Sequence, residues 1–101
     1  MGKEENAIQS AIMEYLTIRN ILNWRNNNIP VPGRRFIGRK GSSDIFALHK
    51  GKFMGIEVKT STGTQSDDQK DFEKDVIDNG GIYILARCVE DVEEMLNEVM
   101  L

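Results

Sequence analysis

Three charged side chains, Asp44, Glu57 and Lys59, lie in a stretch that otherwise reads as two apolar strands joined by a tight turn. Lys50-Gly51 is the predicted turn, because Gly51 can adopt a positive φ without a steric penalty. A two-residue loop there would place Asp44 directly opposite Glu57, with Cβ atoms ~5 Å apart. Two carboxylates this close repel each other unless a cation lies between them or one of them holds a proton. Lys59 points to the same face as Glu57, since side chains alternate along a strand. A bulged three-residue loop would shift the pairing by one residue.

The charges are distributed unevenly along the chain. The net charge is −3, yet the segment 19–59 holds nine basic residues and only two acidic ones, a net of +7. Those two acids are Asp44 and Glu57, and the remainder carries −10, concentrated in 67–78 and 90–98. A basic segment with only two carboxylates is typical of a polyanion-binding face with metal ligands set into it. For the acidic segments we favour solvated charges that keep the protein soluble.

Length and composition indicate one compact domain. The 101 residues are 40% hydrophobic, which suits a single domain spanning 1–101 with a modest core. No apolar run approaches the ~20 residues of a membrane helix, and no signal-peptide core follows the N-terminus. We expect a cytosolic protein without membrane attachment or a small-molecule organic cofactor. Cys88 is the single cysteine, so it forms neither an intrachain disulfide nor a zinc cluster, and we expect a small core residue.

The N-terminal segment has the apolar spacing of an amphipathic helix over 4–22, carried by Ile8, Ala11, Ile12, Tyr15 and Leu16. Glu5 lies close to this stripe, near the helix start. On this feature alone, a favourable interaction with the helix dipole explains Glu5 best.

The rest of the chain predicts further strands and helices. The segment 26–33 is a loop, and 34–40 is a short strand or extended segment. Ser66 and Gln69 have the spacing of a capping box that starts a helix ending at 79–81. Ile82 to Ala86 reads as a buried strand, and 92–100 as a terminal helix. This order predicts an α/β (α+β) fold with a central mixed four-stranded sheet flanked by helices.

Basic and aromatic residues are interleaved before the hairpin. Arg34, Arg35, Arg39 and Lys40 are candidates for contacts with nucleic-acid phosphates. Trp24 could stack on a base or sugar. In a small domain a tryptophan more often belongs to the core, and we favour the core position.

The order of Glu5, Asp44 and the tripeptide Glu57-Val58-Lys59 resembles that of PD-(D/E)xK nucleases, specifically the small VRR-NUC branch. The resemblance covers nearly the whole chain: Glu5 with Ile8-Gln9, Gly41-Ser42-Ser43-Asp44, Ile56 to Lys59, Gly63 before Ser66-x-x-Gln69, and Gly80 to Tyr83. Ser43 departs from the proline that the family commonly has, which leaves the ligand untouched and changes only local stiffness. Archaeal Holliday-junction resolvases share a similar order. The resemblance implies a restriction-endonuclease-like core.

The resemblance also implies phosphodiester hydrolysis with Mg²⁺, for which Mn²⁺ would substitute. Mg²⁺ prefers oxygen ligands and is normally anchored by one or two carboxylates, here Asp44 and Glu57. In the family the backbone carbonyl of the intervening residue, here Val58, also contacts the metal. Glu5 would complete the ligand set or orient a water on the metal.

The resemblance also implies catalytic roles for two further residues. Lys59 would hold the attacking water and the scissile phosphate, and its positive charge favours hydroxide. Gln69 has two interpretations of equal weight. The capping box with Ser66 explains its spacing fully, whereas the family places this glutamine beside the catalytic lysine.

These residues predict a metal-dependent DNA endonuclease. We expect it to select branched or four-way junction DNA in replication, repair or recombination, because so small a chain has little surface for reading bases. The alternative is a non-catalytic nucleic-acid-binding module on the same fold, which would not need Asp44, Glu57 and Lys59 together. A structural or interaction protein would leave two buried carboxylates unexplained. Since one domain offers one site, we expect a homodimer that cuts two strands.

Overall fold

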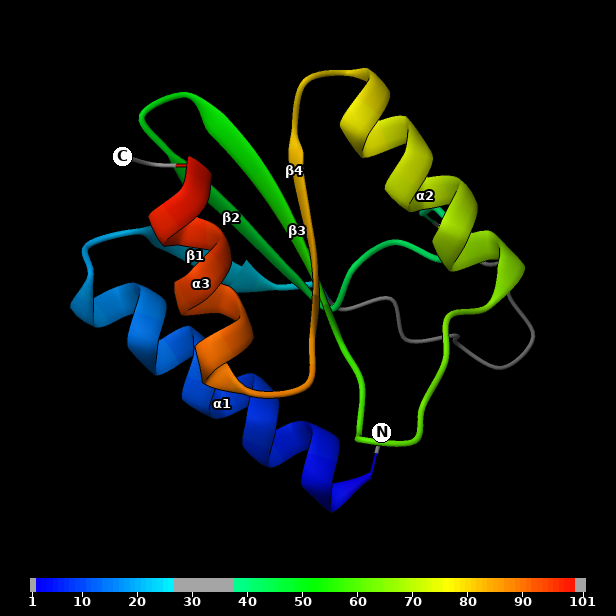
Figure 1. Cartoon of the computed structure of the whole chain (residues 1–101), viewed down its shortest axis with the longest axis horizontal. Helices are drawn as coiled ribbons and strands as arrows, with labels where there is room; N and C mark the ends of the chain where they lie inside the picture. Colours follow the sequence, from blue (N-terminus) through cyan, green and yellow to red (C-terminus); the bar gives the residue numbers. More distant parts are fainter. Residues whose placement is uncertain (1, 27–37, 100–101) are drawn as a thin grey trace.

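The computed structural model describes residues 2–26 and 38–99. It contains three helices and one four-stranded sheet, in the order α1 (Lys3–Ile18), β1 (Leu22–Arg25), β2 (Ile45–His49), β3 (Lys52–Val58), α2 (Asp67–Asp78), β4 (Ile82–Ala86) and α3 (Val89–Val99). The strands are arranged β1-β2-β3-β4, with β1, β2 and β3 antiparallel and β4 parallel to β3 (Figure 1). The predicted α+β fold with a mixed four-stranded sheet is confirmed.

The predicted register of the hairpin is also confirmed. Lys50 and Gly51 have φ values of 51° and 83°, and two positive φ angles are what a two-residue hairpin loop of type I′ requires. Pairing runs from His49 with Lys52 to Ile45 with Ile56. One step further along this register, Asp44 lies opposite Glu57, so the bulged alternative is excluded.

The first strand differs from the prediction. α1 ends at Ile18 instead of near residue 22, because Asn20 takes a left-handed φ of 60° and turns the chain. Leu22–Arg25 then pairs with β2 as β1. The prediction over 34–40 was a short strand or an extended segment, and the strand is wrong for Gly38 to Lys40, which are not in a strand. Residues 34–37 lie outside the described residues.

The main core lies between one face of the sheet and the helices α1 and α3, which lie side by side (Figure 1). Alternate residues of β2, β3 and β4 point into it and are fully or nearly fully buried: Ile45, Ala47, Met54, Ile56, Val58, Ile82, Ile84 and Ala86. They meet Ile12 and Leu16 of α1 and Val92 and Leu96 of α3. Cys88 was expected in the core and is only half-buried. Within the described residues, no helix is long and apolar enough to cross a bilayer.

The opposite face of the sheet carries Asp44, Phe46, Phe53 and Glu57 by the alternation along β2 and β3. α2 covers this face mainly over β4. The β1 side is more open, and Trp24 keeps 42% of its surface exposed. The preference for a core position of Trp24 is therefore wrong. Its ring instead lies edge-on to Phe46, with 6.0 Å between centroids.

Candidate active site

The carboxylate pair lines a cleft of about 330 Å³ between the sheet, the 39–42 loop and the start of α2. The lining residues are Arg39, Lys40, Gly41, Ser42, Asp44, Glu57, Ser66, Asp68 and Gln69. Residues from three separate parts of the sequence meet here, and five of them were predicted as site residues. Arg34 and Arg35, predicted with them, lie outside the described residues.

Glu57 is the most confined acid of the cleft. Only 3% of its surface is exposed. Its Oε2 accepts a hydrogen bond of 3.2 Å from the Gln69 amide, whereas Oε1 is buried and has no hydrogen-bond partner among the described residues. Burial, followed by the neighbouring carboxylate of Asp44, raises the pKa of Glu57 to about 9. Glu57 thus requires a proton or a cation at neutral pH.

Two residues outside the cleft lining also act on this pKa. The positive charge of Lys59 lowers the pKa of Glu57, and the negative charge of Glu5 raises it. Lys59 follows β3 directly, and its backbone N–H donates to the Ala86 carbonyl over 3.0 Å, which continues the pairing with β4. A Cβ at Gly63 would lie 3.3 Å from Cδ of Lys59, so the loop after β3 passes close to this side chain.

Asp44 is oriented by the neighbouring strand. Its Oδ2 accepts a hydrogen bond of 2.8 Å from the backbone N–H of Val58, inside the Glu57-Val58-Lys59 tripeptide. The contact joins the two carboxylate-bearing segments directly. The proposed metal contact of the Val58 carbonyl stays a prediction.

Asn26 is a positioning residue that the sequence patterns did not single out. Its backbone N–H donates to the Asp44 carbonyl over 2.8 Å. Its side-chain amide donates to the Ser43 carbonyl at 3.0 Å and to Ser42 Oγ at 2.9 Å. Asn26 therefore fixes the segment that enters β2. An asparagine at the end of a short strand is the only sequence signal for this role.

Gln69 fulfils the capping role and also reaches the site. Ser66 Oγ accepts from the Gln69 backbone N–H, and Gln69 Oε1 accepts from the Ser66 backbone N–H at 2.8 Å, so the predicted capping box is confirmed. The same side chain uses its Nε2 to donate to Glu57. One amide thus connects the start of α2 with the buried carboxylate. A catalytic role of Gln69 stays a prediction.

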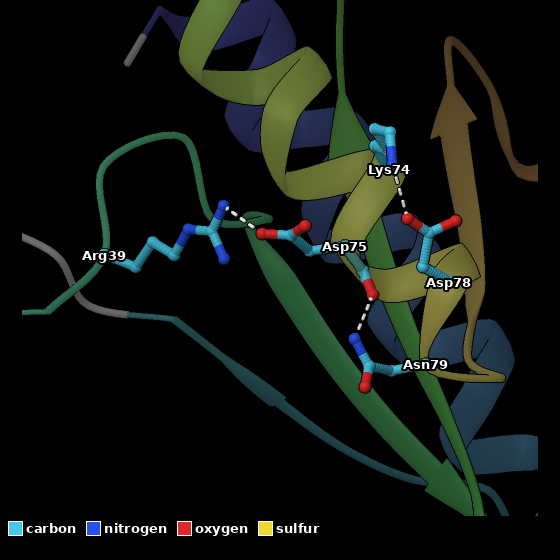
Figure 2. A network of polar contacts seen from close by, with 5 residues as sticks. All are labelled: Arg39, Lys74, Asp75, Asp78 and Asn79. Carbon is cyan, nitrogen blue, oxygen red and sulfur yellow. Dashed lines mark hydrogen bonds and ion pairs between the residues drawn. The ribbon is translucent and has the colours of Figure 1, made fainter.

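The 39–42 loop lies against the first turn of α2. Gly41 has a φ of 81°, and a Cβ there would lie 2.3 Å from the backbone carbon and oxygen of Asp68, so no side chain fits. Arg39 forms an ion pair of 2.6 Å with Asp75 (Figure 2). Its guanidinium lies 5.5 Å from the ring centroid of Phe72. Both partners of the ion pair are about half exposed, so it contributes little stability and can be exchanged.

The donor set is a pair of acids and not a triad. Within residues 2–26 and 38–99, no three His, Cys, Asp or Glu side chains are grouped so that they could hold a metal ion. Glu5, predicted as a further ligand, therefore completes no preformed cluster with Asp44 and Glu57. Two carboxylates with an unsatisfied oxygen still fit Mg²⁺, which retains several waters and needs only one or two carboxylates.

Comparisons with known proteins show which known fold the chain shares. No protein-family model and no curated protein matches the chain. A solved structure described as "VRR_NUC domain" aligns with a TM-score of 0.72 at 15% identity, covering 97% of this chain and 99% of the other. A second, described as "VRR_NUC domain protein", aligns with a TM-score of 0.63 at 15% identity, covering 97% of this chain and 88% of the other. The resemblance inferred from the motifs is thus confirmed in three dimensions, and the chain has the fold of VRR_NUC domains over nearly its whole length.

Proposed function

We propose that this protein is a metal-dependent nuclease that hydrolyses phosphodiester bonds in DNA. The observation that carries the proposal is the carboxylate pair of half-buried Asp44 and buried Glu57, in a cleft lined by Arg39 and Lys40. Among the described residues, Oε1 of Glu57 has no hydrogen-bond partner. An anionic backbone is attracted by the basic side chains, and a cation at the acids would relieve their repulsion. The fold shared with VRR_NUC domains supports the same interpretation.

Asp44 and Glu57 would hold Mg²⁺ or Mn²⁺. Leaving the Glu57 oxygen buried and unpaired costs on the order of 1–3 kcal/mol, which binding of a cation would recover. The metal would supply charge stabilisation for the phosphate and lower the pKa of the attacking water. We propose a supporting role for Glu5 through water, because it completes no preformed group of three acids.

Other residues of the chain would bind the substrate and orient the two carboxylates. Lys59, whose charge acts on Glu57, would bind the scissile phosphate and orient the attacking water. Gln69 keeps Glu57 in one orientation, and the Val58 N–H does the same for Asp44. Lys40 and Arg39 would bind neighbouring phosphates, with Arg39 leaving its exposed pair with Asp75.

A cleavage assay tests the proposal. Labelled single strands, duplexes, flaps and four-way junctions are incubated with Mg²⁺, Mn²⁺ or EDTA. We expect cleavage with either metal, none with EDTA, a preference for branched DNA, and none by folded Asp44→Asn or Lys59→Ala protein. Wild-type rates in Lys59→Ala would contradict the assignment of this lysine. Binding without cleavage of any substrate would favour the non-catalytic module, for which the joint presence of Asp44, Glu57 and Lys59 has no explanation.

We further propose that the working unit is a homodimer. The described residues form one carboxylate cleft, whereas symmetric incision of a four-way junction needs two sites in opposed orientation. A two-fold dimer supplies this arrangement. Light scattering at micromolar concentration should give twice the mass of one chain. A monomer that persists with junction DNA would leave a nicking or single-strand-cutting enzyme.

A further inference from the structure

A second cleft, of about 430 Å³, opens on the sheet face that α2 partly covers. It is lined by Phe46, Phe53, Phe72, Asp75, Val76, Asn79 and Gly81, none of which lines the carboxylate cleft. Three of these seven residues are aromatic and only Asp75 is charged. The chemistry proposed above makes no use of this aromatic cleft.

The two clefts are neighbours on the same strands. Phe46 follows Asp44 by two residues, and it pairs with Gly55, which precedes Glu57 by two. Two residues along a strand span roughly 7 Å and return to the same face, so the aromatic cleft begins one such step from the carboxylates. This step is close to the length of one nucleotide in an extended strand.

Arg39 lies where the clefts meet. It lines the carboxylate cleft and forms its ion pair with Asp75 of the aromatic cleft (Figure 2). Its guanidinium also lies over the ring of Phe72. A DNA strand that places a phosphate near Arg39 therefore brings an adjoining base to the entrance of the aromatic cleft.

The lining of the aromatic cleft suits a base and not a phosphate. The rings of Phe46 and Phe53 lie 5.5 Å apart, and those of Phe46 and Phe72 lie 6.4 Å apart, so the three rings form one continuous apolar surface. Asp75 at the cleft would repel a phosphate. Stacking on aromatic side chains tolerates any base, because each base has a π-face.

We propose that the aromatic cleft binds one unpaired base of the DNA strand whose backbone occupies the carboxylate cleft. The identity of that strand rests on the nuclease function proposed above. A base within a duplex is stacked and paired, so it must be extruded before it can enter. The substrate class is therefore DNA with an unpaired nucleotide beside the bond to be cut, as in single strands, flaps and opened branch points.

The first test measures base binding without cleavage. Lys59→Ala protein is titrated into oligonucleotides that carry 2-aminopurine at successive positions, since stacking on an aromatic ring quenches its fluorescence. We expect quenching at one position of a bound strand. Phe53→Leu and Phe72→Leu, each added to Lys59→Ala, should remove it and weaken binding about fivefold or more. Ile77→Ala, an apolar change on the exposed side of α2 outside the cleft, should leave it intact.

The second test removes the base instead of the ring. An abasic site at the quenched position should weaken binding by the same factor, and Phe53→Leu should then have no further effect, since both changes delete one interaction. Equal affinity for abasic and intact strands, or no binding of any oligonucleotide, overturns the inference. If the wild type cleaves DNA but an abasic site does not weaken binding, only the proposed base-binding site is overturned. Base binding by a protein that cuts no substrate overturns only the nuclease proposal.

Discussion

Glu57 combines near-complete burial, a neighbouring acid and an oxygen without a hydrogen-bond partner in the described part of the chain. Each of these features penalises the ionised form in the absence of a cation. Gln69 satisfies one carboxylate oxygen only, and Lys59 opposes the effect of Asp44 without cancelling it, because the pKa remains raised to about 9. At the residue scale the site is therefore an unbalanced charge cluster that a cation would complete.

Replacing Glu57 with glutamine should stabilise the metal-free protein at alkaline pH. The folded state prefers protonated Glu57, so wild-type stability is fully present below the ordinary pKa of 4.5 and falls as pH rises towards about 9. The glutamine side chain does not titrate and can donate to Asp44. Thermal unfolding is measured in EDTA at pH 5, 7 and 9. The melting temperature of Glu57→Gln should rise relative to that of the wild type as the pH increases. Mg²⁺ should raise the wild-type value alone, and a pH-independent difference would contradict the assignment.

Two adjacent serines should respond oppositely to alanine. Ser43 Oγ is buried without a hydrogen-bond partner among the described residues, so Ser43→Ala removes an unpaired hydroxyl and should stabilise the fold by about 1 kcal/mol. Ser42 Oγ donates to the Arg39 carbonyl at 2.9 Å and accepts from Asn26, so Ser42→Ala should destabilise by about 1 kcal/mol. Urea unfolding of both variants measures the difference. Equal effects of the two changes would refute the distinction.

At the scale of elements, the sequence patterns correctly predicted the features that depend on residues close together in the chain. The turn at Lys50-Gly51 and the capping box of Ser66 depend on residues within a few positions, and both are present. β1 was missed because Leu22 continues the helical apolar spacing of α1, while the left-handed turn at Asn20 has no strong signature.

The candidate site also combines a contact that a local turn fixes with contacts between distant parts of the chain. Asp44 and Glu57 were brought together correctly because a two-residue loop fixes the register of β2 and β3. The contacts of Asn26 with the segment before β2, and of Arg39 with Asp75, join parts of the chain that are 16 or more residues apart. No spacing rule connects such residues, because their meeting depends on how loops lie against α2 and the sheet.

Gly41 should be less tolerant of alanine than Gly51, although their φ angles are nearly equal at 81° and 83°. Alanine at Gly51 meets no atom within 4 Å, so Gly51→Ala should cost only the left-handed strain of roughly 1–2 kcal/mol. Gly41→Ala adds a clash with the Asp68 backbone and must push the 39–42 loop away from α2. Denaturant unfolding and cleavage assays of the pair should show a larger stability loss and lost activity for Gly41→Ala. Equal losses would mean that the loop does not need its close contact with α2.

At the scale of the whole molecule, the basic and the acidic residues come largely from different segments of the chain. The basic segment 19–59 supplies Arg39 and Lys40 to the carboxylate cleft, whereas the acidic residues belong largely to α2 and α3. Of the two acidic helices, α3 lies on the opposite face of the sheet from the cleft, whereas the start of α2 borders it with Asp68. Arg39 and Lys40 at the cleft can still attract a polyanion, so the net charge of −3 does not preclude DNA binding. The same field would orient the strand with its backbone towards Lys40.

Lys40→Ala should therefore reduce the salt dependence of DNA binding, whereas Lys52→Ala should not. Both lysines are exposed, but Lys40 lines the carboxylate cleft and Lys52 lies next to the hairpin turn, at the other end of β3 from Glu57. Each phosphate contact on duplex DNA contributes about 0.9 to the slope of log K against log salt, so Lys40→Ala should lower it by up to that amount. Affinity should fall similarly for all sequences, because a phosphate contact carries no base information. Titrations from low to physiological salt measure both variants, and equal slopes for Lys40→Ala and Lys52→Ala would mean that the backbone runs elsewhere on the surface.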